Sequence, residues 1–485
     1  MNIEAVLCLL GRLCILLFFL LLWPLLLCIG EGGLGTPTAH AFMVSAAVSL
    51  GLGIALQLSF EFEQERFGFG EAFAVVTGSW VVFTALGAMP FVITGQIPGI
   101  VDACFEVLSG FTTTGASILP DPAVLDRPLL FWRAMTQWIG GMGIVALSVA
   151  ILPALGAGGN FLFQAEVPGP ESEKLAPRIR STAKMLWTLY LLVTALQFVC
   201  LWAVGMTPFD SICYTFATVA TGGFGTRADS VASFGPAVQW VVILFMFLAG
   251  LNFVMLLNAV KGRFKIALKN TEVRVYTAIA VLATLFCVIA LRGEPGQPEG
   301  FEPLVRDASF TVVSLLTSTG FVTTNYQLWP IGLHGLLLLL MFCGACAGST
   351  GGGAKVIRCV IAVKTGVREV LRLLRPRAVF VVKVGPRPLT DQLVFKTAGF
   401  FVIYLFSLVA FSLMLMAMGH SGATSFSAVI SCLSNIGPGL DGVGPSSNYA
   451  AFDGTAKLLL MFAMLLGRLE FYSILVLLVP LAWRR

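Results

Sequence analysis

Long apolar segments, separated by short polar ones, follow one another along almost the whole chain. Each is about as long as the roughly 20 helical residues that cross a hydrocarbon core ~30 Å thick. The sequence therefore predicts an integral membrane protein with about ten helical crossings. Their approximate positions are 5–29, 40–61, 72–95, 129–155, 183–205, 237–260, 275–292, 332–362, 394–418 and 456–482.

The first apolar segment has one feature of a signal peptide, because Ala39-His40-Ala41 resembles a cleavage site. The segment is too long for the apolar part of a signal peptide, and the only basic residue near its start is Arg12. We therefore expect a retained membrane helix, and cleavage is the less favoured alternative.

Four polar stretches of similar composition interrupt the apolar pattern. They lie within DACFEVLSGFTTTGAS from Asp102, DSICYTFATVATGGFG from Asp210, DASFTVVSLLTSTGFV from Asp307 and TSFSAVISCLSNIGPG from Thr424. Aligned without gaps, each copy carries a hydroxyl or amide residue and a glycine two positions later. These pairs are Thr113 and Gly115, Thr221 and Gly223, Ser318 and Gly320, and Asn435 and Gly437. An apolar span precedes and follows each copy, so the pattern predicts one unit repeated four times.

Each copy has the pattern of a helix that enters the membrane without crossing it. It opens on Asp102, Asp210, Asp307 or Thr424, all good helix N-caps, and continues for about three turns. The Thr, Ser, Asn and Gly residues that follow predict an extended return loop. Non-helical backbone is tolerated at membrane depth only where protein buries it or water lines it. Four such loops around one axis would satisfy that condition.

The same loops suit a monovalent cation. Inward-pointing backbone carbonyls can replace the hydration shell of an alkali ion, and glycine lets the backbone approach the ion closely. The partly negative C-terminal ends of the short helices would also favour a cation. No acidic side chain lies in the loops, which argues against a carboxylate ring for divalent ions. The alternative of simple turns between helices does not account for four equivalent copies.

Composition agrees with a membrane protein and offers little for enzymatic chemistry. Hydrophobic residues make up 57% of the 485 residues and charged residues only 11%, which is too few for a soluble protein. The three histidines are scattered and indicate no metal site. A polytopic membrane enzyme would need His, Asp or Glu clustered at membrane depth, and the apolar spans lack such clusters. The eleven cysteines form no disulfide framework, and six of them, in apolar spans, are expected to be small buried hydrophobes: Cys8, Cys14, Cys28, Cys200, Cys287 and Cys343.

Basic residues gather in a few loops, which sets the expected orientation. They concentrate in 174–184, in 261–274, in 355–387 and at Arg484 and Arg485, whereas the alternate loops are acidic. By the positive-inside rule, the basic segments and both termini face the cytoplasm. Two explanations fit 355–387, the segment with the most basic residues. One is membrane topology alone, and the other is a docking surface for a cytoplasmic partner or anionic lipid. The sequence leaves both explanations open.

The loops SGFTTTGAS, TVATGGFGT, LLTSTGFVTTNY and LSNIGPGL resemble, in this order, the four pore loops of the Trk/Ktr/HKT superfamily of potassium transporters. The resemblance covers almost the whole chain and is strongest to the bacterial Trk membrane subunits. It implies one key glycine in each loop and a filter lined by the preceding carbonyls. The implied potassium-binding residues are Thr113, Thr114, Gly115, Thr221, Gly222, Gly223, Ser318, Thr319, Gly320, Asn435, Ile436 and Gly437.

The resemblance also implies the fold. We expect an all-α integral membrane protein with four tandem repeats, each a membrane helix, a pore helix and a second membrane helix. The pore would be pseudo-fourfold and similar to that of a potassium channel. The expected segments are 1–68 (two extra N-terminal helices), 69–156 (repeat 1), 181–262 (repeat 2), 273–364 (repeat 3 with a gating loop), 365–391 (a basic cytoplasmic linker) and 392–485 (repeat 4).

The segment FCGACAGSTGGGAK, from Phe342 to Lys355, carries too many glycines for a stable helix. Lys355 is not followed by the Ser or Thr of a Walker loop, so nucleotide binding is not indicated. The resemblance implies an intramembrane loop beneath the filter that gates the pore. The alternative is a close-packed kink. The implied gating residues are Gly348, Gly351, Gly352 and Gly353.

Arg468 lies within the last apolar span, where a charged residue predicts a functional role. Glu470 is two positions further on and points elsewhere on a helix, so we expect Arg468 to face the pore axis. The resemblance implies that this arginine lies below the filter, where it repels cations and anchors the glycine-rich loop through carbonyl groups. The alternative is a structural salt bridge, with Glu470 as a candidate partner.

For function, the resemblance implies potassium uptake across the bacterial inner (plasma) membrane, with K⁺ as the transported ion and no bound cofactor. It implies a homodimer and a separate cytoplasmic NAD- or ATP-binding regulatory subunit of the TrkA type. Membrane lipid is a further expected contact, and no nucleic acid is expected. The alternative is a sodium-preferring or poorly selective transporter of the same fold, because some members replace the first-loop glycine by serine. Gly115 favours potassium.

Overall fold

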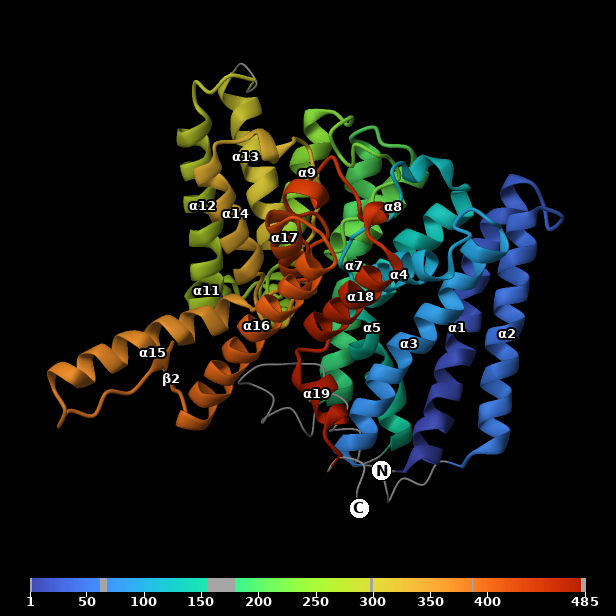
Figure 1. Cartoon of the computed structure of the whole chain (residues 1–485), viewed down its shortest axis with the longest axis horizontal. Helices are drawn as coiled ribbons and strands as arrows, with labels where there is room; N and C mark the ends of the chain where they lie inside the picture. Colours follow the sequence, from blue (N-terminus) through green and yellow to red (C-terminus); the bar gives the residue numbers. More distant parts are fainter. Residues whose placement is uncertain (1, 62–67, 156–178, 297–299, 386, 481–485) are drawn as a thin grey trace.

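The computed structural model describes residues 2–61, 68–155, 179–296, 300–385 and 387–480, and these are mostly helical (Figure 1). Lys174, Arg178, Arg484 and Arg485 of the predicted basic segments lie outside the described residues. The helices are α1 (Ile3–Glu31), α2 (Pro37–Ser59), α3 (Phe69–Ile93), α4 (Ile100–Phe111), α5 (Arg127–Leu155), α7 (Ile179–Ala203), α8 (Pro208–Val219), α9 (Pro236–Ala249), α10 (Phe253–Val260), α11 (Phe264–Lys269), α12 (Thr271–Leu291), α13 (Phe301–Leu316), α14 (Ile331–Cys343), α15 (Val356–Leu374), α16 (Asp391–Ala417), α17 (Gly422–Leu433), α18 (Gly454–Arg468) and α19 (Tyr472–Leu478).

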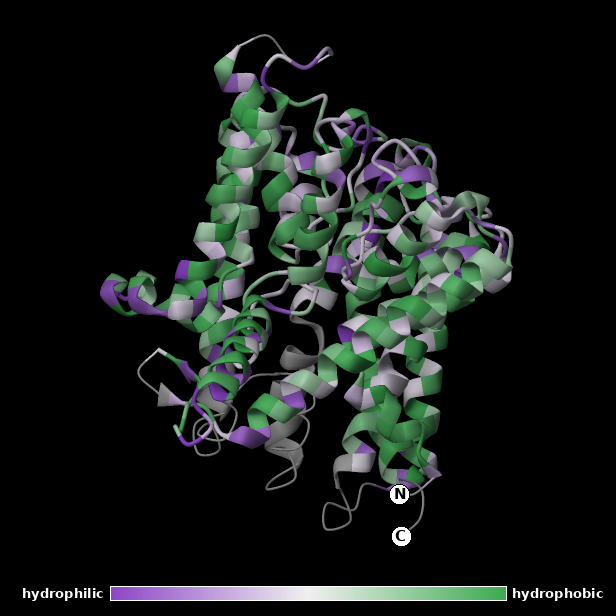
Figure 2. Cartoon of the chain, turned by 60° about the vertical axis from the view of Figure 1, so that its left-hand side comes forward, coloured by the Kyte–Doolittle hydropathy of each residue, from purple (hydrophilic) through white to green (hydrophobic). Residues whose placement is uncertain are grey.

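The helices of the bundle consist mostly of hydrophobic residues, as expected for a protein that uses the bilayer as solvent (Figure 2). Side chains more than half exposed include Val281 and Ile289 on α12 and Phe395 and Phe406 on α16. Within the described residues, six helices are long and apolar enough to cross a membrane, or up to eight if each of two bent pairs is one span. The predicted all-helical membrane protein is confirmed, with fewer unbroken spans than the ten predicted.

Three of the predicted spans are broken. The predicted 237–260 bends by 109° between α9 and α10, and the predicted 456–482 bends by 117° between α18 and α19. The predicted 332–362 is not one span, since α14 ends at Cys343 and α15 begins only at Val356. Figure 1 shows α15 leaving the bundle at a steep angle to α12 and α14. Hydropathy missed these breaks because the segments on both sides of each break are rich in apolar residues.

Local residues account for the two sharp bends. At the first, Gly250 ends α9, and Asn252 Oδ1 caps α10 by accepting hydrogen bonds from Val254 N and Met255 N. At the second, Glu470 and Phe471 have φ of 55° and 59°, a left-handed conformation that no α-helix accommodates.

The four predicted units pack against one another in a closed cycle. In each unit, a short helix (α4, α8, α13 or α17) packs on the long helix that precedes it and on the helix that follows it. The helix that follows also packs on the short helix of the next unit: α5 on α8, α9 on α13, and α14 on α17. The cycle closes where α18 packs on α4. The short helices are therefore surrounded by protein, which permits non-helical backbone beside them at membrane depth.

The N-caps of the short helices differ from the prediction. Asp102, Asp210 and Thr424 lie at the third helical position, and the caps are Gly99, Thr207 and Ser421. Asp307 lies inside α13, which begins two turns earlier at Phe301. The prediction was wrong because acidic and hydroxyl residues also favour the first helical turn, where they stabilise its unpaired N–H groups.

The two N-terminal helices lie outside the cycle. Helix α1 packs along α2 and also contacts α3 and α5. Ala39 and Ala41 are buried near the start of α2, so the sequence that resembles a cleavage site is helical in this structure.

Candidate functional site

The four short helices end in the same backbone motif. In each, one N–H group donates to the carbonyl three residues earlier and the next N–H group donates to the carbonyl five residues earlier, which is a Schellman C-cap. The residue in the left-handed position of this cap has a φ between 52° and 58°. These residues are Thr113, Thr221, Ser318 and Asn435.

None of these left-handed residues is the glycine that such a cap favours. A left-handed conformation costs an L-residue roughly 1–2 kcal/mol. Each of the four loops therefore keeps a side chain at this position although glycine would avoid that cost. Ser318 Oγ accepts a hydrogen bond from Gly352 N, and Asn435 Nδ2 donates to Thr114 Oγ1 and Met464 O. Thr113 Oγ1 is buried and has no hydrogen-bond partner within the described residues.

The glycine two positions after each left-handed residue contacts the next loop. Gly115, Gly223, Gly320 and Gly437 have φ between 76° and 99°. A β-carbon on the first three would overlap the carbonyl oxygens of Gly222, Thr319 and Ile436, respectively. A β-carbon on Gly437 would lie 2.8 Å from Thr114 O. Each loop therefore touches the next in the order 1, 2, 3, 4, 1, and the four glycines and four carbonyls form one ring.

This ring presents carbonyl oxygens and no carboxylates. Along each loop, φ is positive at the left-handed residue, negative at the next residue and positive at the ring glycine. This alternation turns successive peptide groups to one side of the loop, whereas in a strand they point to alternating sides. Thr114, Thr319 and Ile436 are fully buried. The ring can offer several carbonyl oxygens to an unsolvated cation, and the Thr113 hydroxyl, which lacks a partner, suits the same role.

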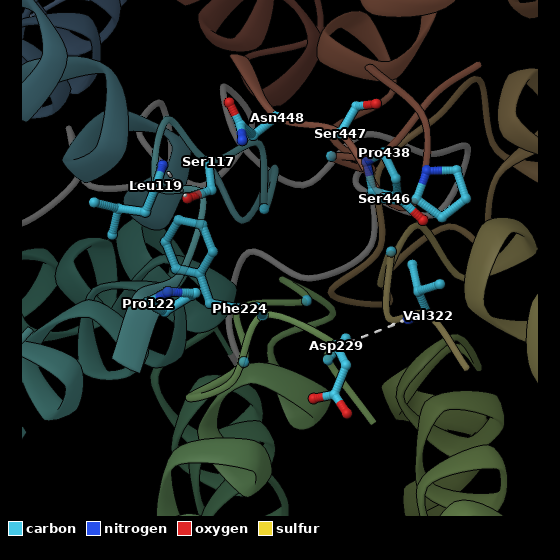
Figure 3. Close-up of a pocket in the computed structure, with 18 of the residues that line it drawn as sticks. Ser117, Leu119, Pro122, Phe224, Asp229, Val322, Pro438, Ser446, Ser447 and Asn448 are labelled. Atoms are coloured by element: carbon cyan, nitrogen blue, oxygen red, sulfur yellow. Dashed lines mark hydrogen bonds between the residues drawn. The ribbon is translucent and has the colours of Figure 1, made fainter. Parts of the chain in front are cut away.

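A cavity of about 430 Å³ lies beside the ring and is lined by all four loops (Figure 3). The four ring glycines contribute to its wall, together with residues such as Ser117, Phe224, Val322 and Pro438. The cavity gives the ring an approach from one side.

Asp441, next to this cavity wall, is held away from the ring. It accepts hydrogen bonds from Ser421 Oγ at 2.5 Å and Thr424 Oγ1 at 2.7 Å, and these bonds lower the pKa of its carboxyl group. The carboxylate therefore stays ionised at neutral pH and fixes the start of α17.

Comparison with known proteins identifies the family. The TrkH family, described as cation transport proteins, matches residues 38–289 and 302–482. The chain belongs to the TrkH family. The Trk system potassium uptake protein TrkH of Salmonella typhimurium is 40% identical over 419 residues, which are 85% of this chain and 86% of that protein. TrkG of Escherichia coli is 35% identical over 421 residues, 85% of each chain.

A solved structure extends the similarity to the fold. The crystal structure of the potassium transporter TrkH from Vibrio parahaemolyticus aligns over 100% of both chains, with a TM-score of 0.87 and 35% sequence identity. The superfamily resemblance in the four loops is thereby confirmed. Since TrkH proteins are transporters, the polytopic-enzyme alternative is excluded.

In this TrkH family member the glycine-rich loop, residues 344–355, lies against the third and fourth ring loops. Gly352 N donates to Ser318 Oγ at 2.5 Å, and a β-carbon on Gly352 would overlap Ser434 O. A β-carbon on Gly351 would lie 2.7 Å from Thr317 O. Gly348 and Gly353 have positive φ, and Gly348 packs against Asn252.

Arg468 connects this loop to the rest of the protein. Its Nη1 donates to Thr350 O at 2.9 Å and its Nη2 donates to Gly140 O at 2.6 Å. Glu470, the candidate partner in the alternative, instead forms a salt bridge with Arg358, at 2.5 Å. Thr350 Oγ1 donates to Val219 O at 3.0 Å, which ties the loop to the second unit.

Sequence reasoning missed the side chains that support the ring. Gln137 Nε2 donates to Gly222 O at 2.6 Å, and its Oε1 accepts from Phe224 N at 3.0 Å. Glu106 and Arg133 form a buried ion pair beside the same loops. The available signal was a Glu, an Arg and a Gln inside segments that are otherwise apolar.

Replacing Thr113 by glycine should stabilise the fold slightly. The change removes the strain of the left-handed conformation, and the Thr113 hydroxyl has no hydrogen bond to lose within the described residues. The strain of roughly 1–2 kcal/mol exceeds the extra chain entropy of glycine, about 0.5–1 kcal/mol. Asn435→Gly is the matched control and should destabilise, since it loses bonds to Thr114 and Met464. Thermal unfolding of both variants in detergent measures this. Equal destabilisation would mean that the Thr113 hydroxyl is engaged after all.

Proposed function

We propose that the chain takes up potassium across the plasma membrane, through a selectivity filter made by the four loops. The observation that carries the proposal is the closed ring in which each of four equivalent glycines touches a carbonyl of the next loop. A ring of backbone carbonyls is the ligand set that replaces the hydration shell of K⁺. The relatives named above are potassium uptake proteins, which supports the same conclusion.

The transported ion would bind to loop carbonyls, with K⁺ as cargo and no cofactor. The binding residues in this proposal are Thr113, Thr114, Gly115, Thr221, Gly222, Gly223, Ser318, Thr319, Gly320, Asn435, Ile436 and Gly437. The absence of a β-carbon at Gly115 favours potassium over the sodium-preferring alternative. The four repeats, with the boundaries that the sequence predicts, would be related by pseudo-fourfold symmetry and would place these residues around one axis.

The glycine-rich loop would gate this pathway. It lies against Ser318 and Ser434 at the base of two filter loops, and its glycines leave room for no side chain there. Arg468 would hold the loop closed through Thr350 O and would add a positive charge that repels cations.

The cytoplasmic side would carry α15 and the basic segment. α15 projects sideways from the lower half of the bundle in Figure 1, toward the end where α1 begins, and Arg372, Arg375 and Arg377 on it and after it are exposed. By the positive-inside rule this end faces the cytoplasm, together with both termini. We infer that the exposed basic surface receives a TrkA-type nucleotide-binding subunit and that the membrane subunit is a homodimer.

Rubidium uptake into vesicles that hold the purified protein alone tests the proposal. An inward rubidium gradient or a negative internal potential should drive uptake, the potential contributing ~2.3 kcal/mol per charge per 100 mV. Potassium should compete and sodium should not. NAD or ATP added without a partner should leave the flux unchanged. Equal competition by sodium would favour the poorly selective alternative, and absence of flux in any gradient would contradict the proposal.

A further inference from the structure

Four hydrogen bonds between units hold the four loops, each at the residue two positions after the ring glycine. The carbonyl oxygens at these positions belong to Ser117, Gly225, Val322 and Gly439. Each accepts one hydrogen bond from a different unit. The donors are Tyr449 N to Ser117 O at 2.9 Å, Arg133 Nη1 to Gly225 O at 2.8 Å, Val231 N to Val322 O at 3.1 Å, and Tyr326 Oη to Gly439 O at 3.0 Å. We call these four bonds the collar.

The collar has one direction around the ring. Unit 1 donates to loop 2, unit 2 to loop 3, unit 3 to loop 4, and unit 4 to loop 1. The donors differ in chemistry, since two are backbone N–H groups, one is a phenol and one is a guanidinium. Donors of three chemical kinds that reach the same carbonyl position indicate that the position itself must be held.

The guanidinium is set in place by a buried ion pair. Glu106 on α4 and Arg133 on α5 are 1% and 3% exposed, and Glu106 Oε1 lies 2.6 Å from Arg133 Nε. The carboxylate also accepts hydrogen bonds from Ser117 Oγ at 3.0 Å and Ile118 N at 2.9 Å. The Arg133 guanidinium lies over the Phe224 ring at 3.5 Å. One ion pair therefore holds the outgoing ends of loops 1 and 2 together.

The filter backbone needs support at both ends. The helix C-cap fixes the start of each loop. The glycine two residues later has no side chain to restrict its backbone, so it adds little stiffness to the loop. Selectivity between cations depends on the size and stiffness of the carbonyl ring. The bond at the glycine-plus-two carbonyl joins each loop to another unit soon after the ring glycine, so it limits how far the ring can widen or contract.

We infer that the collar sets the cation selectivity of the filter, with Glu106, Arg133 and Tyr326 as positioning residues that touch no ion. This inference rests on the proposed potassium filter. It assigns selectivity to contacts between units, in addition to the ligands within each loop. Loss of one collar bond should let the ring adapt to a smaller ion.

Tyr326→Phe tests the collar with the smallest change, since it removes only the hydroxyl that donates to Gly439 O. We expect the potassium-to-sodium permeability ratio of reconstituted protein to fall roughly threefold or more, the size of one lost hydrogen bond. Glu106→Gln should have a larger effect, because it also leaves Arg133 without its counter-charge. Tyr190→Phe is the matched control: its buried hydroxyl donates to Trp138 O at 2.9 Å, outside the collar. It should show the same small change in thermal stability and a wild-type ratio.

Gly115→Ser, measured beside these variants, separates the two proposals. If it shifts the ratio while Tyr326→Phe and Glu106→Gln keep the wild-type ratio, the collar is refuted and the filter stands. If Gly115→Ser leaves the ratio unchanged as well, the filter and the collar both fail. Should Glu106→Gln not fold, Tyr326→Phe alone decides. A drop in the ratio for Tyr190→Phe equal to that for Tyr326→Phe would also refute the collar, since any lost buried bond would then suffice.

Discussion

Serine at position 115 should abolish most of the preference for potassium over sodium. A β-carbon there overlaps Gly222 O, so the carbonyl of the second loop has to move away from its place in the ring. Neither atom can yield by a rotamer change, because both belong to backbone held by helix caps. Gly115 also has a φ of 76°, which an L-residue adopts at a cost of roughly 1–2 kcal/mol. We expect the permeability ratio to fall about tenfold or more, equivalent to about 1.4 kcal/mol.

The control must share the backbone strain and lack the overlap. Gly205 has a φ of 98°, and a β-carbon on it would meet nothing within 4 Å. Gly205→Ser should therefore keep the wild-type ratio of potassium to sodium flux even if it lowers thermal stability. A wild-type ratio for Gly115→Ser would mean that the ring does not select the ion.

Much of the ring could be predicted from the sequence, because its chemistry is carried by residues that are local to each loop. A gapless alignment places Thr113, Thr221, Ser318 and Asn435 in one register, and the structure gives all four the same left-handed conformation. Whether they bind an ion stays a prediction. The glycine-rich loop was also visible, since glycine at that density does not continue a helix.

The parts that were missed depend on contacts between distant segments. Asn252 ends a predicted straight span because its side chain caps α10 and donates to Ala347 O at 2.6 Å. Nothing local distinguishes that asparagine from a polar residue on a helix surface. The collar is invisible for the same reason, since two of its donors are backbone N–H groups and its acceptors are carbonyls.

The same cyclic order recurs at three levels of the structure. Each following helix packs on the short helix of the next unit, each ring glycine touches a carbonyl of the next loop, and each collar bond reaches the next unit. A change in one loop is therefore passed to the loops next to it. We expect substitutions in adjacent loops to be non-additive in their effect on selectivity, as for residues that share contacts.

Alanine at position 468 should raise rubidium flux through the protein alone, by about tenfold or more. Arg468 donates to Thr350 O in the glycine-rich loop and to Gly140 O on α5, and hydrogen bonds from a charged group contribute about 1.5–3 kcal/mol each. Without them, the loop keeps its bond from Gly352 N to Ser318 Oγ and loses its connection to α5. The barrier to the cation also falls, since the partly buried positive charge of Arg468 is gone.

Two controls separate the charge from the contact. Arg468→Lys keeps the charge but cannot reproduce the planar fork that reaches two carbonyls, so its flux should lie between wild type and Arg468→Ala. Arg127→Ala removes an exposed arginine that pairs with Glu31 at 3.3 Å, and should leave flux unchanged. The potassium-to-sodium ratio should stay at the wild-type value in all three variants, because the carbonyl ring is untouched. Flux that falls in Arg468→Ala would show that this arginine supports conduction, and the gating role would then be wrong.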